Sequence, residues 1–206
     1  MTTARTEYPG LTRKGAATRA RIVTAAADLM LGQGVARTST EDVRAAAAVS
    51  NSQLYHYFTG KTALVRAVIT YQTDQILAGQ QPLLSNLDSL QALTAWRDLL
   101  VDSHRRRTRP GGCPIGSLAY ELPVTDPDTR AALADGFARW DTAIHDGLRA
   151  MHRRGDLIPG ADPDQLALGI LAALQGGLLL TRVMQTVAPL EAGLDTAIGY
   201  IRSLTT

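Results

Sequence analysis

Residues 37–61 of this chain, RTSTEDVRAAAAVSNSQLYHYFTGK, decide its fold. The pattern predicts two short helices, at about 40–47 and 51–57, joined by a tight turn. In the second helix Leu54 and Phe58 lie four residues apart and form one apolar stripe, while the other side chains are polar or aromatic. A helix this short is unstable alone and needs a scaffold, and its polar surface is suited to contact a partner. The motif that fits is a helix-turn-helix.

The first helix of the motif has a buried stripe and a capped start. Val43 and Ala47 are separated by the i, i+4 spacing of one helix face. Thr38 and Ser39 are both suitable N-caps, and Glu41 follows Thr38 at the spacing of a capping box. We therefore expect the box to join Thr38 to Glu41.

The turn and the second helix resemble the recognition-helix region of the TetR (tetracycline-repressor-like) family of transcriptional regulators. The similarity extends over about residues 14–70, and the positions that match the family pattern are Val49, Ser50, Asn51, Ser52, Gln53, Leu54, Tyr55, His56, Tyr57, Phe58 and Lys61. The chain departs from the family at Ala48, where glycine is usual. Glycine would relieve strain in a tight turn, so alanine there predicts a slightly different turn.

The resemblance implies that the second helix lies in the major groove of DNA and reads base edges. Gln53 is then the best candidate for bidentate recognition of adenine, with Asn51 second. Tyr57 matches a family position that binds phosphate, and Lys61 adds a positive charge. The residues expected to contact DNA are Thr38, Thr40, Ser50, Asn51, Ser52, Gln53, Tyr55, His56, Tyr57 and Lys61.

Two of these assignments have open alternatives. Either Thr38 or Thr40 can bind a phosphate through its hydroxyl and the free backbone N–H groups of a helix start. Tyr55 can contact DNA or pack half inside the head. The alternative for the whole set is a solvated polar helix, which four successive aromatic residues disfavour.

Composition predicts an all-α protein, because aromatic residues make up only 5% of the 206 residues and β-branched runs are rare. The net charge is +2, but residues 1–61 hold eight Lys or Arg against four Asp or Glu, so the positive charge gathers near the N-terminus. A small basic DNA-reading head would have this distribution, although chance remains an alternative. The single cysteine and the absence of a signal peptide predict a cytoplasmic protein, placed by DNA binding on the nucleoid.

Further helices follow from apolar periodicity and from Pro and Gly positions. They are expected at about residues 14–31, 61–81, 86–107, 126–154, 163–185 and 189–204. We predict a flexible basic tail at 1–13, a helix-turn-helix head at 14–60 and a ligand-binding and dimerisation domain at 61–206. The most apolar run, Leu166 to Leu180, is expected to be too short to cross a membrane, so no membrane partner is predicted.

Residues 112–122, GCPIGSLAYEL, resemble a TetR subgroup with a Gly-Cys-Pro segment in the body. The resemblance implies that this region borders a cavity for a small molecule. Aromatic and sulfur side chains of the body are candidates to line that cavity, and the alternative for each is the core. The candidates are Trp96, Cys113, Tyr120, Phe137 and Trp140.

The last two helices, at about 163–186 and 189–204, carry much apolar surface. They can complete the core of the monomer or pair with a second copy, and the resemblance implies a four-helix homodimer interface. Gly169, Gly176 and Gly177 suggest that another helix approaches closely, since glycine in a helix costs about 1 kcal/mol against alanine.

The leading hypothesis is a dimeric, ligand-responsive transcriptional regulator, a repressor by the resemblance, that binds an inverted-repeat operator and is released by a small hydrophobic or aromatic molecule. Activation instead of repression stays open. An enzyme is disfavoured because the sequence has no HExxH, metal-ligand spacing, P-loop or nucleotide-binding glycine pattern, and no cofactor or metal is expected. The remaining alternative is a helical protein that binds small molecules without binding an operator, for which Ala48 is the only support.

Overall fold

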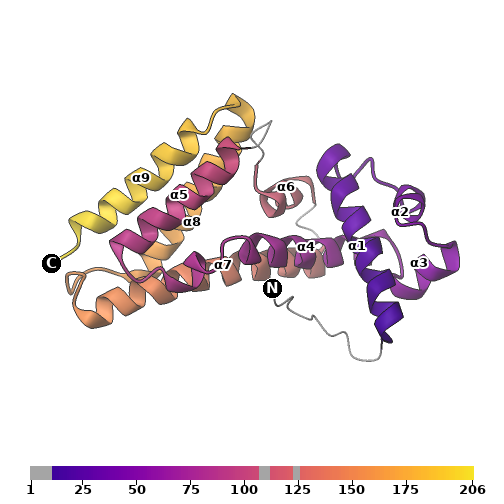
Figure 1. The fold of residues 1–206 in the computed structure, drawn as a ribbon, viewed down its shortest axis with the longest axis horizontal. Helices are drawn as coiled ribbons and strands as arrows, with labels where there is room; N and C mark the ends of the chain where they lie inside the picture. Colours follow the sequence, from indigo (N-terminus) through magenta and orange to yellow (C-terminus); the bar gives the residue numbers. More distant parts are fainter. Residues whose placement is uncertain (1–10, 107–111, 123–125) are drawn as a thin grey trace. The chain divides into compact units, whose positions relative to one another are not determined.

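The computed structural model describes residues 11–106, 112–122 and 126–206, and in these residues the regular structure is helical apart from one isolated bridge between Leu157 and Thr205. The predicted all-α class is confirmed (Figure 1). The helices are α1 (Arg13–Gln33), α2 (Thr40–Ala46), α3 (Asn51–Tyr57), α4 (Lys61–Ala78), the 3-10 turn η1 (Leu83–Asn86), α5 (Leu90–Arg105), α6 (Pro114–Glu121), α7 (Pro127–Arg154), α8 (Pro163–Met184) and α9 (Ala188–Ser203).

The chain forms two compact units. Unit 1 combines Met1–Gln72 with Glu121–Ala132, and unit 2 combines Thr73–Tyr120 with Leu133–Thr206. Helices α4 and α7 each begin in unit 1 and end in unit 2. The first ten residues of the predicted tail lie outside the described residues, and the domain boundaries drawn from the sequence stay a prediction.

Unit 1 is a small helical head built on α1. The N-cap Thr12 accepts a hydrogen bond from the backbone N–H of Gly15, and the helix ends at Gly34, whose N–H bonds to the carbonyl of Met30. The buried face of α1 packs with α2, and the core continues through α3 and α4. Its buried apolar residues are Ile22, Val23, Ala26, Ala27, Met30, Val43, Val49, Leu54, Phe58, Leu64, Val65 and Val68.

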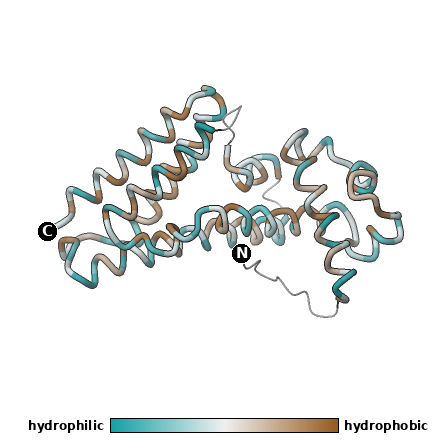
Figure 2. The backbone as a smooth tube through the Cα atoms, in the orientation of Figure 1, coloured by the Kyte–Doolittle hydropathy of each residue, from teal (hydrophilic) through white to brown (hydrophobic). Residues whose placement is uncertain are grey.

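Unit 2 contains a layer in which α9 runs alongside α8 and α5 (Figure 1). Hydrophobic and hydrophilic positions alternate along α9, as expected for an amphipathic helix (Figure 2). Its Leu190 and Leu194 are fully buried. The backbone of α9 comes so close to α8 that a Cβ on Gly177 would lie 2.8 Å from the Cα of Leu190. The predicted close approach is therefore found at Gly177, whereas a Cβ on Gly169 or Gly176 would meet no atom of the described chain within 4 Å.

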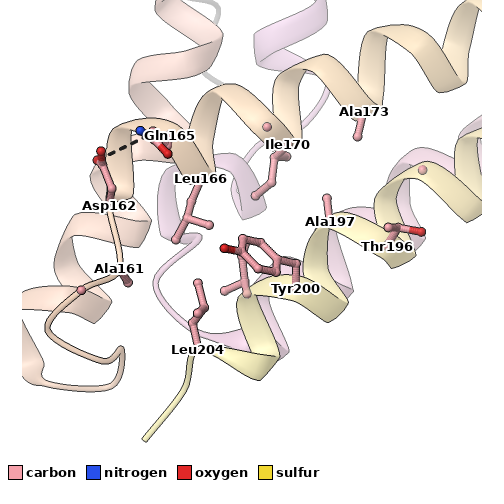
Figure 3. Close-up of a pocket in the computed structure, with 14 residues that line it drawn as sticks. Ala161, Asp162, Gln165, Leu166, Ile170, Ala173, Thr196, Ala197, Tyr200 and Leu204 are labelled. Carbon is pink, nitrogen blue, oxygen red and sulfur yellow. Dashed lines mark hydrogen bonds between the residues drawn. The ribbon is translucent and has the colours of Figure 1, made fainter.

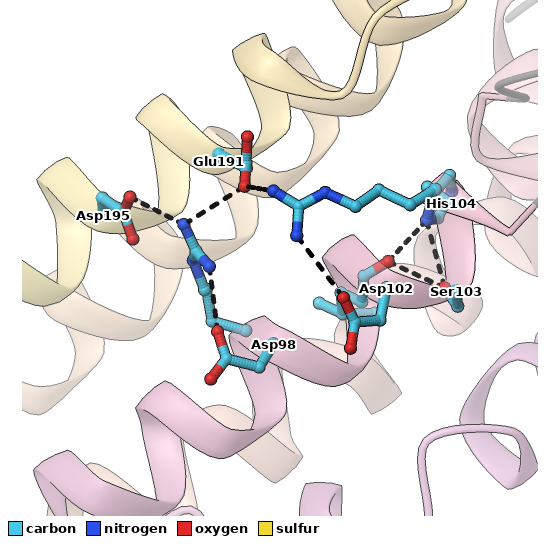
Figure 4. A network of polar contacts seen from close by, with 9 residues as sticks. Asp98, Asp102, Ser103, His104, Glu191 and Asp195 are labelled. Carbon is cyan, nitrogen blue, oxygen red and sulfur yellow. Dashed lines mark hydrogen bonds and ion pairs between the residues drawn. The ribbon is translucent and has the colours of Figure 1, made fainter.

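An ionic network joins α5 to α9 at the surface of this layer (Figure 4). Arg97 is only 17% exposed at its side chain and lies 2.8 Å from a carboxylate oxygen of Asp195 and 3.7 Å from Glu191. Arg105 also pairs with Glu191. The pKa of Arg97 is raised: burial alone would lower it, but hydrogen bonds to Asp195 and Asp98 outweigh that effect. The network therefore links α5 to α9 at two positions, Arg97 and Arg105.

Two helix boundaries differ from the sequence-based expectation, and one helix was not expected. Helix α4 ends at Ala78 instead of about residue 81, because Gly79 follows and the chain turns before Pro82. Helix α5 begins at Leu90 after the N-cap Ser89, whose side chain accepts from the N–H of Ala92. Helix α6 was not among the helices expected from the sequence; it covers most of the Gly-Cys-Pro segment.

The expectation that the apolar run is too short to cross a membrane was also wrong. Helix α8 has 22 residues and an 18-residue window of mean hydropathy 1.7, so by length and composition alone it could cross a membrane. That is weak evidence, since core helices of soluble proteins have the same properties, and 44% of the window is buried inside the chain. Asp162 caps the helix through the N–H groups of Asp164 and Gln165.

Candidate nucleic-acid interface

A capping box fixes the start of α2. The Ser39 side chain accepts a hydrogen bond from the N–H of Asp42 at 3.1 Å, and the Asp42 carboxylate accepts one from the N–H of Ser39 at 2.8 Å. The expected box between Thr38 and Glu41 was therefore wrong by one residue, and Glu41 instead pairs with Arg44. Hydrogen bonds from the hydroxyl and backbone of Ser39 hold the pKa of Asp42 below its usual value.

The turn between α2 and α3 contains one residue in the left-handed backbone conformation, which glycine adopts most easily. Ala48 has φ of +51°, and its N–H bonds to the carbonyl of Ala45. Val49, the next residue, is 5% exposed and anchors the turn in the core. The turn therefore keeps a positive φ despite the alanine, at a cost of about 1 kcal/mol or more for a residue with a Cβ.

A second capping box begins α3 and involves the residue expected to read bases. The Ser50 hydroxyl accepts from the N–H of Gln53 at 3.2 Å, and the Gln53 side-chain oxygen accepts from the N–H of Ser50 at 2.9 Å. The Ser50 and Ser52 hydroxyls lie 3.0 Å apart. Asn51, Ser52 and Gln53 are all exposed. The start of α3 is thus ordered by its own side chains and still faces solvent.

The aromatic residues of α3 divide between solvent and the head. Tyr55 is 55% exposed, so about half of its surface faces solvent and the rest is covered by the head. His56 is exposed, and its ring meets the half-buried ring of Tyr57 edge to face, with centroids 4.9 Å apart. The Tyr57 hydroxyl lies 3.3 Å from the position of a Cβ on Gly15, so it reaches the first turn of α1.

The two threonines have different environments. Thr38 is 1% exposed, and its hydroxyl donates to the carbonyl of Gly34 at 2.8 Å, so this side chain is part of the loop between α1 and α2. Thr40, the first residue of α2, is partly exposed. Lys61 begins α4, and its ammonium group lies 3.4 Å from the carbonyl of Ala36 in the same loop.

Sequence reasoning missed Glu121, which contacts this loop from a position far along the chain. Its carboxylate accepts a hydrogen bond from the N–H of Val35 at 2.7 Å. No short-range pattern connects two residues 86 positions apart, so no sequence signal could have found the contact.

The five candidate ligand residues all belong to unit 2, but their environments differ. Trp96 is fully buried, and its Nε1 donates to Gln80 at 2.8 Å. Trp140 is 2% exposed, and its Nε1 has no hydrogen-bond partner in the described part of the chain. Phe137 is half-buried, and Tyr120 is 91% exposed.

The remaining candidate, Cys113, precedes α6 and is 6% exposed. Burial raises the pKa of its thiol, with smaller opposing contributions from hydrogen bonds. Such a thiol is protonated and unreactive at neutral pH. Among the described residues, no three His, Cys, Asp or Glu side chains gather to hold a metal ion.

A groove of about 410 Å³ lies between α8 and α9 within unit 2 (Figure 3). Leu166 and Ile170 of α8 point toward Tyr200 of α9 and Leu204, the residue after α9, across the groove (Figure 3). Tyr200 is 61% exposed, so the groove is open to solvent on this side.

Two family models match the chain. Residues 22–68 match the model described as bacterial regulatory proteins, tetR family, and residues 89–197 match the one described as tetracyclin repressor-like, C-terminal domain. The second match alone spans more than half of the chain. The chain belongs to the TetR family. It is a transcriptional regulator with a helix-turn-helix head, as the sequence resemblance implied.

Known TetR-family relatives resemble the chain over most of its length. An uncharacterised helix-turn-helix transcriptional regulator of Lactococcus lactis is 31% identical over 183 residues, covering 86% of this chain and 90% of the relative. A repressor named DhaR from a Mycobacterium species is 24% identical and covers 84% of this chain and 86% of the relative. A TetR regulator from Chloroflexus aurantiacus has a crystal structure with a TM-score of 0.79 at 28% identity, covering 94% of this chain and 98% of that one.

TetR-family regulators bind DNA operators, form dimers and bind small-molecule effectors, and they are soluble and typically cytoplasmic. The relatives are regulators and not enzymes. The match to the head covers α2, α3 and the start of α4, which carry most of the candidate DNA contacts.

Proposed function

We propose that this TetR-family regulator represses transcription by binding an inverted-repeat operator as a homodimer, and that a small hydrophobic or aromatic molecule releases it. The observation that carries the proposal is the surface of α3. Leu54 of α3 and Phe58, the residue after this helix, anchor α3 in the core, while most of its polar and aromatic side chains face outward. Capping boxes order the starts of both α2 and α3. Operator binding would place the protein on the nucleoid.

The exposed start of α3 supports base reading by Asn51 and Gln53. In the free protein the Gln53 oxygen accepts the N–H of Ser50, so bidentate recognition of adenine requires this side chain to leave the capping box. Asn51 makes no side-chain hydrogen bond in the described part of the chain and needs no such release. Ser50 and Ser52 complete the set that faces the base edges.

The phosphate contacts would surround this reading end. Thr40 is the better candidate of the two threonines, because the Thr38 hydroxyl is buried and engaged with Gly34. The Tyr57 hydroxyl beside the first turn of α1, the Lys61 ammonium group, and the exposed Tyr55 and His56 are the remaining proposed contacts.

DNA selection with purified protein and random duplexes tests the proposal. Enrichment of an inverted repeat is expected, and a folded protein that enriches nothing would support the alternative of a small-molecule-binding protein without an operator. The selected site then allows a test of Gln53. Gln53→Glu keeps the capping box, since glutamate also accepts at this position, but it cannot donate to adenine. The added negative charge should weaken binding to all sequences alike, so the loss of base reading, about 1–3 kcal/mol, is measured as the lost difference in affinity between the selected operator and an operator changed at that one base pair.

The apolar surface of α8 and α9 supports a homodimer through these helices. Large side chains stay exposed along them: Leu168, Leu179, Leu180, Val183, Met184 and Tyr200 are each at least 50% exposed. Soluble monomers rarely expose an apolar patch of this kind. A second copy of the same two helices would cover this surface and the groove between them, and a two-fold axis would place two heads on a palindromic site.

A charge placed in this patch tests the interface. Val183 is 72% exposed, so Val183→Glu should not disturb the monomer but should dissociate the dimer in sedimentation or light-scattering experiments. Leu31→Glu is the matched control, because Leu31 is 56% exposed and lies on α1, outside the proposed interface. A Val183→Glu protein that remains a tight dimer would place the interface elsewhere.

Unit 2 offers Trp140 as the candidate contact for an effector. A buried indole N–H without a partner costs about 1–3 kcal/mol, and a ligand with a hydrogen-bond acceptor would recover it. Phe137, three residues earlier on α7, is half-buried and can supply an aromatic wall. Trp96 is a weaker candidate because Gln80 already satisfies its N–H, and Tyr120 and Cys113 stay proposed on the resemblance of the Gly-Cys-Pro segment alone.

A further inference from the structure

Glu121 makes a hydrogen bond that orders the loop between α1 and α2. This loop, residues 34–39, belongs to unit 1, as does Glu121 itself. The Glu121 carboxylate accepts the N–H of Val35 at 2.7 Å. The preceding residue, Tyr120, belongs to unit 2, so the bond lies where the chain passes from one unit into the other.

The conformation of Gly34 creates the need for this acceptor. Gly34 has φ of +88° and ψ of 157°, a region open essentially to glycine alone. Its own N–H closes α1 on the carbonyl of Met30, and the chain then turns so that the N–H of Val35 makes no bond to the helix. Val35 is 7% exposed, and a buried backbone N–H must find a partner. Glu121 is that partner.

A side chain at Gly34 would displace the Glu121 carboxylate. A Cβ on Gly34 would lie 2.9 Å from the carboxylate oxygen that accepts the N–H of Val35, so the flexible Glu121 side chain would have to shift. Glycine is required at this position by its backbone conformation, and its lack of a side chain leaves room for the carboxylate.

The loop in turn sets the position of α2. The Thr38 hydroxyl donates to the carbonyl of Gly34 at 2.8 Å, and the next residue, Ser39, caps α2. Lys61 lies 3.4 Å from the carbonyl of Ala36, so the loop is also joined to the start of α4. A change at Val35 would reach α2, the turn and α3 through these bonds.

We propose that Glu121 is a positioning residue for DNA binding: its carboxylate holds the α1–α2 loop in the conformation that presents α2 and α3 to the operator. The inference rests on operator binding as proposed above. Glu121 contacts no DNA in this account. It acts through the N–H of Val35 and the loop that follows.

Glu121→Ala removes the acceptor, whereas Glu121→Gln keeps an oxygen in the same place. We expect Glu121→Ala to weaken binding to the selected operator about tenfold, equal to about 1.4 kcal/mol, and Glu121→Gln to retain most of the affinity. The salt dependence of binding should not change, because no phosphate contact is lost. Asp128→Ala is the matched control: Asp128 lies in the same chain segment and pairs with Arg66 at 2.7 Å, without contacting the loop.

Hydrogen–deuterium exchange of peptides covering residues 34–39, without DNA, gives an independent readout. Exchange should accelerate in Glu121→Ala and stay near the wild-type rate in Glu121→Gln and Asp128→Ala. Unchanged exchange in Glu121→Ala would overturn the contact, and accelerated exchange with wild-type operator affinity would overturn the positioning role. If the wild-type protein selects no operator, the exchange result still reports the contact, so the two failures are distinguishable. Should Glu121→Ala not fold, Glu121→Ser serves as the variant that removes the carboxylate.

Discussion

Two adjacent glycines of α8 should respond in opposite ways to the same substitution. A Cβ on Gly177 would lie 2.8 Å from the Cα of Leu190 and 3.2 Å from the carbonyl oxygen of Pro189, both backbone atoms of α9. A Cβ on Gly176 would meet no atom of the chain within 4 Å. Gly177→Ala must therefore push α9 away, whereas Gly176→Ala has room within the chain.

The magnitude follows from the contact distance. Carbon atoms pack best at about 3.5–4.0 Å, so the new methyl group of Gly177→Ala is roughly 0.7 Å too close to a backbone atom. Overpacking of this kind costs about 1–3 kcal/mol. Both substitutions gain about 1 kcal/mol of helix propensity. We expect Gly176→Ala to stabilise unit 2 by about 1 kcal/mol, and Gly177→Ala to be less stable than Gly176→Ala by about 1–3 kcal/mol, since the propensity terms cancel.

Tryptophan fluorescence during urea unfolding is the suitable assay. The chain has two tryptophans, Trp96 and Trp140, and both are buried in unit 2, so the signal reports the unit that contains the substitutions. Protein concentration must be equal and the oligomeric state of each variant verified, because dimerisation contributes to stability. Equal unfolding free energies for the two variants would refute the close approach of α9 at Gly177.

Three other substitutions test separate parts of the structure. Ala48→Gly should stabilise the head by about 1 kcal/mol, because it relieves the positive φ at a smaller cost in unfolded-state entropy, and slower amide exchange in α2 and α3 would show it. Trp140→Phe removes the unpaired N–H together with part of the indole ring, so it should lower stability and also weaken effectors that carry an acceptor more than effectors that lack one, whereas the control Trp96→Phe should lower stability without discriminating among effectors, as ligand titrations would show. Hydrogen bonds from Ser39 lower the pKa of Asp42. The capping box of α2 is therefore intact above the usual carboxyl pKa and is lost as the pH falls through the lowered pKa of Asp42. Acid should accelerate amide exchange in α2 less in Asp42→Asn than in the wild-type protein.

The helix-turn-helix could be predicted from the sequence because its signals are local. Helix α3 spans Asn51–Tyr57 as expected, since Ser50 is a cap and the apolar spacing fits one face. The capping box of α2 was predicted one residue too early, because Thr38–Glu41 and Ser39–Asp42 have the same spacing and chemistry. What separates them is the bond from the Thr38 hydroxyl to Gly34, which depends on the folded loop.

The candidate effector site was harder to predict because it depends on tertiary partners. Trp96 and Trp140 both fit the apolar spacing of long helices, so the sequence gives no reason to distinguish them. Only the fold shows that Gln80 satisfies the indole N–H of Trp96 and that Trp140 lacks such a partner. Tyr120 was a candidate as an aromatic residue next to an apolar segment, yet its side chain is 91% exposed because it lies on the outer face of α6.

The composition of α8 is explained by two apolar faces. One face, with Leu166, Ile170, Leu174 and Leu178 at helical spacing, is buried within the chain. Other apolar side chains of the same helix remain exposed, which is why a helix with membrane-like hydropathy is only 44% buried over its most apolar window. A second copy of α8 and α9, as we propose, would cover these exposed apolar side chains, while the backbone contact at Gly177 and the ion pair of Arg97 with Asp195 hold α9 against α8 and α5 within each copy.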